Sequence, residues 1–279
     1  MSAGQSYAAP AKLNLMLRVT GRRADGYHLL QSVFRLLDYG DGLSFALRDD
    51  GVISRVNDIP GVTAHEDLTV RAARLLQQVS GCRLGADITL EKRLPLGGGL
   101  GGGSSDAATV LIVLNRLWGL NYSRARLQEL ALQLGADVPF FVFGESALGE
   151  GIGEKLRPLA LPPAWYVVLV PPCAVATARI FREPDLIRDS IPIKIPPFSA
   201  ATCRNDLEAV VCRLYPDVAG HLEWLRQFGK AAMTGSGGCV FCEFGTAAEA
   251  QSVLRQLLPG MRGFAAPGLD RHPLWQMCE

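Results

Sequence analysis

The sequence has little net charge, few lysines and too few cysteines for a disulfide-bonded scaffold. Among 279 residues there are seven cysteines and five lysines, and the formal net charge is +1. A nearly neutral chain has no general attraction to nucleic acid or to an acidic membrane surface. Scattered, odd-numbered cysteines in a long chain predict reduced thiols and a cytoplasmic location, because disulfide scaffolds are shorter and denser in cysteine.

A membrane-spanning segment and a secretion signal are also lacking. The longest uncharged apolar run, Leu159 to Ala178, contains four prolines, which exclude a continuous transmembrane helix. The N-terminus has no basic start followed by an apolar stretch, so no signal peptide is predicted. The 48% hydrophobic and 20% charged composition is typical of a soluble globular protein with one large domain or two smaller ones.

A metal-binding cluster is not evident either. Cys239 and Cys242 form a C-x-x-C pair, but no second pair or nearby histidine completes a zinc site. The alternation in CVFCEF indicates a buried strand instead. No residue is therefore assigned as a metal ligand.

Hydrophobic periodicity gives a coarse map of the elements. Alternation predicts strands over residues 12–19, 86–94 and 239–244, and helical spacing predicts helices over 65–79, 104–118, 123–134, within 205–218, near 221–228 and over 247–258. Residues 138–144 indicate a buried strand or turn. Because strands and helices mix without regular βαβ alternation, the predicted class is α+β. The proline-rich residues 158–165 predict domains of residues 1–157 and 158–279, and a second low-complexity stretch covers residues 191–198.

A glycine-rich loop between a predicted strand and a predicted helix is the most informative feature. Six glycines occupy the seven positions from Gly97 to Gly103, and Ser104, Ser105 and Asp106 follow as good helix caps. Bare N–H groups at a helix N-terminus can wrap an anion, and the helix dipole adds partial positive charge. The loop therefore predicts a phosphate site, with a flexible linker or tight packing turn as the weaker alternative.

Familiar phosphate loops do not match. A Walker A loop ends with a lysine before Ser or Thr, and this loop has none. Gly97, Gly99 and Gly102 satisfy G-x-G-x-x-G, but a dinucleotide fold also needs a following strand and an acid about 20 positions on. Here a predicted helix follows, and residues 117–128 contain no acid. The H-R-D and D-F-G motifs of protein kinases are also missing.

The stretch LPLGGGLGGGSSDAA instead resembles the phosphate loop of the GHMP kinases, a superfamily of small-molecule kinases. PAKLNLMLRVTGRRADGYH resembles their N-terminal motif, and MTGSGGCVFCEF resembles their C-terminal glycine motif. With LDYGD, LGADVPFF, GEGIGE and NDLE…YP, the resemblance covers about Pro10 to Phe244. It implies an N-terminal domain like ribosomal protein S5 domain 2, a ferredoxin-like C-terminal domain and an ATP-binding cleft between them.

The motif set is most similar to the branch of this superfamily that acts on a cytidyl diphosphate of methylerythritol. That branch implies ATP- and Mg²⁺-dependent phosphorylation of the 2-hydroxyl of the methylerythritol unit, in the non-mevalonate pathway of isoprenoid precursor biosynthesis. Three alternatives stay open: a GHMP kinase for homoserine or a mevalonate derivative, a non-catalytic nucleotide-binding module, and a nicotinamide oxidoreductase. The expected partner is a small-molecule substrate, with no nucleic acid and no membrane, and the expected state is a monomer or weak homodimer.

The resemblance changes the interpretation of two charged residues. From the residues alone, Asp137 beside glycine and proline indicates a capping aspartate, and Lys12 a solvated lysine at a strand start. The resemblance implies that Asp137 is the catalytic base and that Lys12 holds it ionised. Asn14 alternates with Lys12, shares its face and is assigned to substrate positioning.

The remaining site residues also come from the resemblance. Tyr27, His28 and Phe181 are implied to contact the cytosine, and Thr177 is a further substrate contact. The nucleotide contacts are Lys92, Pro95, Leu96, Gly97, Gly98, Gly99, Leu100, Gly101, Gly102, Gly103, Ser104, Ser105 and Asp106. The residues Gly235, Ser236, Gly237 and Gly238 support the phosphates from the second domain.

One position departs from the family pattern. Asp67 stands where these kinases commonly carry asparagine, near the adenine. A carboxylate only accepts hydrogen bonds, whereas an amide also donates them, so the expected adenine contacts change. No dedicated Mg²⁺ ligand can be identified among the residues near the loop.

Overall fold

The computed structural model describes residues 5–63, 65–193 and 204–278. The strands are β1 Tyr7–Arg22, β2 His28–Arg48, β3 Ile53–Arg55, β4 Gly85–Glu91, β5 Ala147–Gly151, β6 Lys155–Pro158, β7 Trp165–Leu169, β8 Ala231–Met233, β9 Val240–Phe244 and β10 Gly263–Leu269. The helices are α1 Leu68–Ser80, α2 Gly102–Leu117, α3 Arg124–Leu132, α4 Val138–Phe143, α5 Thr177–Ile180, α6 Glu208–Leu214, α7 Pro216–Arg226, α8 Ala247–Leu254 and the 3₁₀-helix η2 Trp275–Cys278. The α+β prediction is confirmed.

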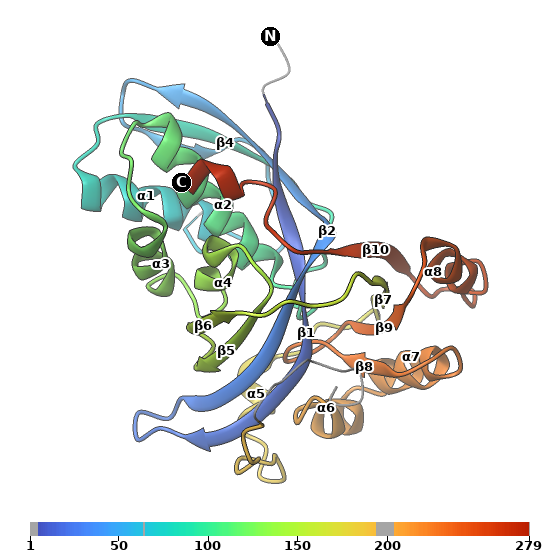
Figure 1. Cartoon of the computed structure of the whole chain (residues 1–279). Helices are drawn as coiled ribbons and strands as arrows, with labels where there is room; N and C mark the ends of the chain where they lie inside the picture. The colour runs from blue at the N-terminus through green and yellow to red at the C-terminus, as the bar shows by residue number, and fades with distance from the viewer. Residues whose placement is uncertain (1–4, 64, 194–203, 279) are drawn as a thin grey trace.

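Strands β1 and β2 form a long antiparallel hairpin through the middle of the molecule (Figure 1). Every residue from Ala9 to Leu17 is buried. A strand with one solvent-facing side would alternate between buried and exposed residues. Protein therefore covers β1 on both sides, and its polar side chains can meet groups from both halves of the chain.

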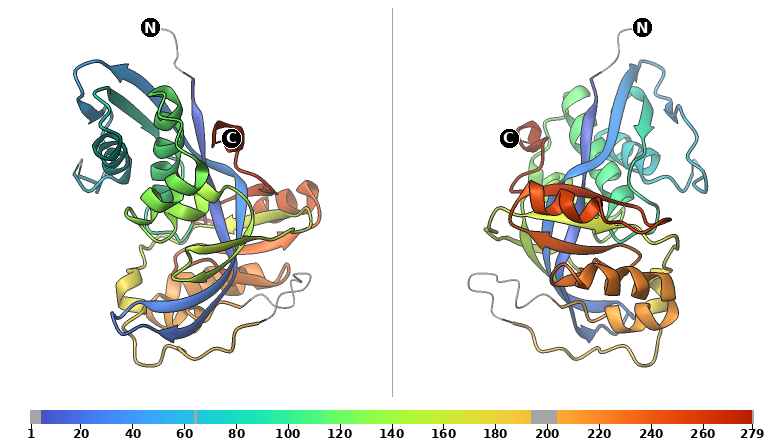
Figure 2. Two further views of the ribbon diagram at one scale, coloured as in Figure 1. Left: turned by 60° about the vertical axis from the view of Figure 1, so that its left-hand side comes forward. Right: turned by 90° about the vertical axis from the view of Figure 1, so that its right-hand side faces the viewer.

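Strand β2 belongs to a larger sheet with the order β3-β4-β2-β10-β7-β9-β8. Strand β5 also pairs with β2, and β6 pairs with β5. Helices α1 and α2 pack beside the N-terminal strands, and α3 and α4 pack on α2. Helices α7 and α8 lie beside β7 to β10 (Figures 1 and 2). Each half has its own apolar cluster, and a third cluster, which includes Leu13, Leu100, Tyr166 and Phe241, connects the two halves. None of the helices in the described part of the chain is long and apolar enough to cross a membrane.

The helix after the glycine loop begins earlier than predicted. Gly101 is its N-cap, in the left-handed region with φ +73°, and no side chain caps it. Ser104, Ser105 and Asp106 therefore lie inside helix α2, so their predicted role as caps is wrong. Because glycine tolerates positive φ, the chain turns into the helix on bare backbone and leaves the first N–H groups unused by a side chain.

Two other local predictions are corrected. Residues 138–143 form helix α4, not a strand, and every residue from Val138 to Val142 is buried. An apolar run that is buried all round has no periodicity to distinguish helix from strand. The helix predicted within residues 205–218 is interrupted: α6 ends at Leu214, and α7 starts at Pro216, whose ring suits a first helical turn but not a helix interior. Residues 194–198 of the second low-complexity stretch lie outside the described residues.

The C-terminal segment crosses back to the N-terminal half (Figure 1). The N–H of His272 donates to the carbonyl of Gly144 at 2.8 Å, at the end of α4. Arg124 donates to the carbonyls of Val142 and Phe143 and to that of Trp275, and its guanidinium lies 3.6 Å from the Trp275 ring centroid. The end of α4 is thus fixed by the last residues of the described chain. The division of the chain near residue 158 stays a prediction.

Burial of His272 makes the stability of this segment depend on pH. Burial, followed by the charge of Arg124, lowers the pKa of His272 to about 3. The unfolded histidine takes up a proton near pH 6.5, whereas the folded one stays neutral until about pH 3. Below pH 6.5 the unfolded state therefore binds more protons, and stability falls as the pH falls through this window. Between pH 7 and pH 5 the expected loss from this group is about 2 kcal/mol.

Urea unfolding at the two pH values measures this loss. The control is His272→Asn, which keeps an acceptor for the N–H of Leu274 but cannot titrate. The wild-type protein should lose more stability between pH 7 and pH 5 than this variant. Equal losses would contradict the assignment.

Candidate active site

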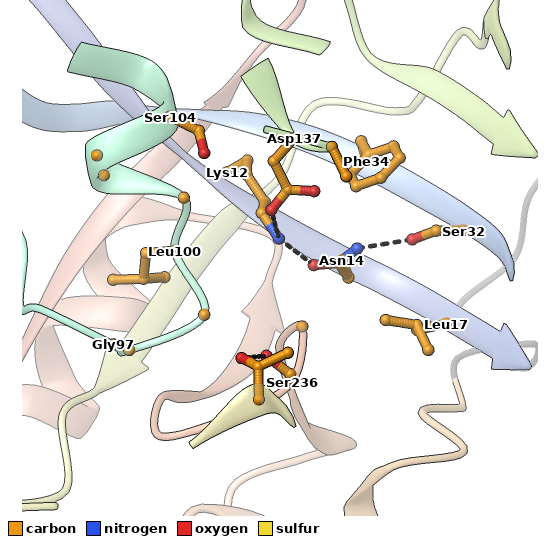
Figure 3. A pocket seen from close by; sticks show the side chains of 18 of the residues that line it. Lys12, Asn14, Leu17, Ser32, Phe34, Gly97, Leu100, Ser104, Asp137 and Ser236 are labelled. Atoms are coloured by element: carbon orange, nitrogen blue, oxygen red, sulfur yellow. Dashed lines mark hydrogen bonds and ion pairs between the residues drawn. The ribbon is translucent and has the colours of Figure 1, made fainter. Parts of the chain in front are cut away.

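A cavity of about 500 Å³ lies where strand β1, the glycine loop and the C-terminal glycine turn meet (Figure 3). Many of the predicted site residues line it: Lys12, Asn14, Lys92, Pro95, Leu96, Gly97, Gly98, Gly99, Leu100, Gly101, Gly102, Gly103, Ser104, Asp137, Thr177, Phe181, Gly235 and Ser236. They come from both halves of the chain. The fold therefore brings together residues more than 200 positions apart in the sequence.

Lys12 and Asp137 face each other at this cavity. The Lys12 ammonium lies 3.4 Å from Oδ2 of Asp137. Figure 3 marks this ion pair with a dashed line. The lysine side chain is 3% exposed and the aspartate side chain 39% exposed, so a buried cation holds a carboxylate that solvent can reach. Asp137 stands at the N-cap of α4 but makes no capping hydrogen bond. The interpretations as a capping aspartate and a solvated lysine are therefore wrong.

A chain of hydrogen bonds fixes the position of Lys12. Its Nζ donates to Oδ1 of Asn14, whose Nδ2 donates to Oγ of Ser32 at 2.7 Å. The Ser32 hydroxyl then donates to the carbonyl of Met16 at 2.7 Å. Because an ammonium can only donate, the Asn14 amide is oriented with its oxygen toward Lys12. The C-terminal half also holds the backbone of Asn14, because the N–H of Asn14 donates to Oγ1 of Thr234 at 2.9 Å.

The glycine loop adopts a shape that side chains would prevent. Gly97, Gly99 and Gly101 have φ of +69°, +79° and +73°. A Cβ atom on Gly99 would lie 2.3 Å from the carbonyl oxygen of Thr234, well inside contact distance. The N–H of Lys12 donates to the carbonyl of Leu100 at 2.9 Å, which ties the loop to strand β1. The loop is thus held in one conformation on bare backbone, with helix α2 directly behind it.

The second glycine turn packs against the first. A Cβ atom on Gly238 would lie 3.1 Å from Cα of Gly98, and the N–H of Cys239 donates to the Gly98 carbonyl at 3.0 Å. Asn205 holds the other end of the turn, since its Nδ2 donates to the carbonyl of Gly235 at 2.8 Å. Gly237 and Gly238 support the loop from behind and do not line the cavity.

Thr177 and Ser236 join helix α5 to the second glycine turn. Their hydroxyl oxygens are 2.6 Å apart, and both residues line the cavity. The contact places a polar edge opposite the glycine loop. A hydroxyl pair of this kind can donate to or accept from a polar ligand.

Lys92 is held by two carboxylates, one of which the sequence analysis did not identify. Its ammonium lies 2.5 Å from Oδ2 of Asp41 and 2.9 Å from Oδ2 of Asp106. Oδ1 of Asp41 accepts the N–H groups of Arg93 and Leu94 at 2.6 and 2.8 Å. Asp41 thereby fixes the segment that enters the glycine loop, and Lys92 connects it to helix α2 on the far side.

The protonation of this cluster follows from burial. Burial raises the pKa of Asp106 to about 8, although the Lys92 ammonium opposes that rise. Burial would lower the pKa of Lys92, but Asp106 and Asp41 raise it overall, so the ammonium stays charged. Asp41 makes the shorter of the two contacts with the ammonium. The cue in the sequence was the LDYGD motif, which carries Asp41 but does not say what it pairs with.

Asp67 has a local structural role. It is the N-cap of α1, and its Oδ1 accepts from the N–H and the hydroxyl of Thr69, both at 2.8 Å. Its Oδ2 pairs with Arg55 at 2.7 Å, and both side chains are buried. Leu68, not Asp67, lines the cavity. Both carboxylate oxygens are thus engaged by protein groups.

Of the three aromatic residues that the sequence analysis assigned to a base, Phe181 lines the cavity, whereas Tyr27 and His28 are not among its lining residues. Phe181 lines the cavity and stacks on His28, with ring centroids 4.8 Å apart and planes 28° apart. Burial lowers the pKa of His28, and the charges of Arg188 and Arg22 lower it further. Tyr27 is 61% exposed at the end of the β1–β2 hairpin. A polar-and-aromatic corner therefore adjoins the cavity at its α5 end.

Some of the cavity wall was missed, and some predicted residues lie behind it. Leu17, Leu30, Ile152 and Leu207 supply apolar surface, and nothing in the sequence distinguishes them from core residues. Ser105 and Asp106 are buried inside α2. Within the described ranges, no group of three or more His, Cys, Asp or Glu side chains could hold a metal ion. Burial raises the pKa of the Cys239 thiol to about 12, which makes it an unreactive core residue.

A glycine loop at a helix N-terminus, a buried lysine beside an accessible carboxylate and a second glycine turn define the GHMP kinase class of site. The family model for the N-terminal domain of GHMP kinases matches residues 67–145, and the model for their C-terminal domain matches residues 198–260. Two solved structures share the fold. One is a homoserine kinase from Cytophaga hutchinsonii, with a TM-score of 0.69 and 16% sequence identity. The other is a mevalonate kinase from Methanococcus jannaschii, with a TM-score of 0.67 and 14% sequence identity. The first match covers 98% of this chain and 97% of the other, and the second covers 96% and 99%.

Closer relatives narrow the class. The chain is 62% identical over 277 residues to the 4-diphosphocytidyl-2-C-methyl-D-erythritol kinase of Nitrosospira multiformis, covering 98% of this chain and 94% of that protein. It is 60% identical to the kinase of the same name from Thiobacillus denitrificans, covering 97% and 98%. A crystal structure of such a kinase aligns with a TM-score of 0.80 at 34% identity, covering 95% of this chain and 99% of the other. The chain therefore belongs to the 4-diphosphocytidyl-2-C-methyl-D-erythritol kinase family.

Asp41→Asn tests how far the glycine loop depends on the buried ion pair. The amide can keep one oxygen for the N–H groups of Arg93 and Leu94, but its NH₂ group then faces the Lys92 ammonium. Removing one partner of a buried pair costs roughly 3 kcal/mol of unfolding free energy. ATP affinity should fall as well, because the segment entering the loop loses its anchor.

Urea unfolding and calorimetric titration with ATP measure the two effects. Glu91→Gln is the matched control, since it breaks an exposed pair with Arg93 that is worth at most about 1 kcal/mol. If Asp41→Asn has the same unfolding free energy and the same ATP affinity as this control, the ion pair does not hold the loop.

Proposed function

We propose that the chain transfers the γ-phosphoryl group of ATP to the 2-hydroxyl of 4-diphosphocytidyl-2-C-methyl-D-erythritol, a step of non-mevalonate isoprenoid precursor biosynthesis. The observation that carries the proposal is the pair of Lys12 and Asp137, 3.4 Å apart, in the cavity bounded by the glycine loop. A module that only binds nucleotide would need neither residue. Identity of 62% to a kinase named for this substrate supports the choice of acceptor.

The glycine loop binds the phosphates of ATP. Residues Pro95 to Ser104 line the cavity, and the N-terminus of α2 adds its unpaired N–H groups and the positive end of its dipole. Ser105, Asp106 and Lys92 hold this arrangement from behind or beside the loop. The second glycine turn, Gly235 to Gly238, supports it from the other half of the chain.

Asp137 acts as the general base. It takes the proton of the 2-hydroxyl as the oxygen bonds to the γ-phosphorus and the bond from that phosphorus to the β-phosphate oxygen breaks. Lys12 pairs with the carboxylate and stabilises negative charge near the attacking oxygen. Asn14 orients Lys12 and completes the polar edge on strand β1.

Mg²⁺ fits the oxygen donors of this site. It takes few protein ligands and completes its shell with phosphate oxygens and water. The Ser104 hydroxyl and the Asp137 carboxylate would be the side-chain donors at the cavity, and ATP held by the loop would provide phosphate oxygens. An ion held there would neutralise charge on the phosphates. Asp106 is turned away from the cavity toward Lys92 and is not a ligand.

The substrate occupies the end of the cavity near α5. Phe181, with Tyr27, stacks on the cytosine, His28 reads its edge, and Thr177 contacts the polar part of the substrate. The apolar wall, which includes Leu17 and Leu30, accommodates the carbon skeleton of the acceptor. We further propose that residues 1–157 and 158–279 form the two domains and that the enzyme works in the cytoplasm as a monomer or weak homodimer.

A coupled ADP-release assay with ATP, Mg²⁺ and a panel of acceptors tests the reaction. The panel consists of the cytidyl diphosphate of methylerythritol, homoserine, mevalonate and galactose. We expect turnover with the first acceptor only. Turnover with homoserine or mevalonate and none with the cytidyl compound would show that the acceptor is misassigned.

Asp137→Asn tests the catalytic base. The amide keeps the shape of the side chain but cannot take up the hydroxyl proton, so kcat should fall by about 10²–10⁴ with little change in KM. Asp58→Asn serves as the control, because Asp58 is fully exposed and outside the cavity. If kcat of Asp137→Asn lies within a factor of two of the control, Asp137 is not the general base.

A further inference from the structure

Arg188 joins His28 to the segment that carries Phe181. Its Nε lies 3.2 Å from Nε2 of His28, and its Nη2 donates to the carbonyls of Phe181 at 3.1 Å and Glu183 at 2.6 Å. Its Nη1 donates to the carbonyl of Leu186 at 3.0 Å. Every nitrogen of the guanidinium thus has a partner, and the group is fixed against the edge of the His28 ring.

This contact determines which nitrogen of His28 carries the proton. A guanidinium has only donors and keeps its charge in proteins, so Nε2 of His28 must accept. A neutral imidazole with an accepting Nε2 carries its proton on Nδ1. Burial and the neighbouring Arg188 and Arg22 lower the pKa of His28, which keeps the ring neutral. Among the described residues, none hydrogen-bonds to Nδ1, so its N–H is available to a ligand.

We infer that Arg188 is a positioning residue for base recognition: it fixes the Nδ1–H tautomer of His28, so that this histidine presents a donor to N3 of the pyrimidine. The inference rests on the proposed function and adds to it a residue outside the motif set. Cytosine has an accepting N3, whereas N3 of uracil carries a hydrogen. A donor that faces N3 therefore suits cytosine and opposes uracil, and the other tautomer, which places an acceptor there, would reverse that preference.

Stacking on the aromatic rings does not distinguish cytosine from uracil. Phe181 offers a face on which any pyrimidine can stack, and base stacking is tolerant of base identity. A polar group left without a partner, in contrast, costs enough to change affinity by about tenfold or more. Selectivity for cytidyl over uridyl substrates therefore depends on the tautomer of the His28 ring, which Arg188 determines.

The first test measures kcat/KM with the cytidyl and the uridyl diphosphates of methylerythritol. Arg188→Met removes the donor and should lower the cytidyl-to-uridyl ratio by about tenfold. Arg188→Lys keeps a group that can only donate and should retain more of the ratio than Arg188→Met. Arg213→Met is the matched control, because Arg213 anchors the same segment through Glu183 and Asp185 without touching His28. Its ratio should equal that of the wild type.

A loosened Phe181 segment would give a different pattern. Both substrates would then lose kcat/KM by the same factor, and an unchanged ratio in Arg188→Met would overturn the inference. A ratio that falls as far in Arg213→Met as in Arg188→Met would do the same.

The second test does not depend on turnover. The ¹⁵N NMR shifts of the imidazole nitrogens report the tautomer directly, and the chain has only four histidines, so His28→Gln identifies the relevant signals. We expect Nδ1–H in the wild type and in Arg213→Met, and Nε2–H or a mixture in Arg188→Met. Nε2–H in the wild type would overturn the inference. If the acceptor panel showed no turnover with the cytidyl compound, the proposed function would fail, while these spectra would still decide the role of Arg188.

Discussion

The site depends on one close contact between two stretches of bare backbone, the glycine loop and the second glycine turn. Gly99 approaches the carbonyl of Thr234 so closely that a single β-carbon would separate them. Because each stretch comes from a different half of the chain, their contact fixes the relative position of the halves as well as the shape of the loop. The hydrogen bond from Lys12 to Leu100 then attaches strand β1 to the same point. The phosphate site of the glycine loop and the pair of Lys12 and Asp137 therefore both depend on main-chain contacts at Gly99 and Leu100.

Buried charges complete this arrangement. Lys12 and Lys92 both lie beside the glycine loop, and each is held by oxygen atoms on more than one element. Lys92 is enclosed by Asp41 and Asp106, while the partner of Lys12, Asp137, remains accessible to solvent. The two lysines therefore differ in function for a physical reason. One cation is neutralised inside the protein and stabilises the loop, and the other holds a carboxylate that a ligand can reach.

The sequence was sufficient where the chemistry is local. The glycine loop, its adjoining helix and the alternation of Lys12 with Asn14 follow from spacing alone, whereas the link between Lys12 and Asp137 came from the family resemblance. Helix α4 was missed because Phe140 and Phe141 are buried on all sides and carry no period. Asp41 and Arg188 could not be assigned from the sequence, since their partners lie 51 and 160 positions away. The apolar wall of Leu17 and Leu30 was missed because a leucine that faces a cavity looks like one in the core.

The return of the C-terminal segment to helix α4 has a consequence for synthesis on the ribosome. Arg124, which fixes the end of that helix, meets the carbonyl of Trp275 across 151 positions of sequence. At about 5–20 residues per second, roughly 8 to 30 s pass between the translation of the two. During that interval the helix that begins beside Asp137 lacks its final cover. The C-terminal end of α4 is therefore completed last, after strand β10 and the segment that follows it have been translated.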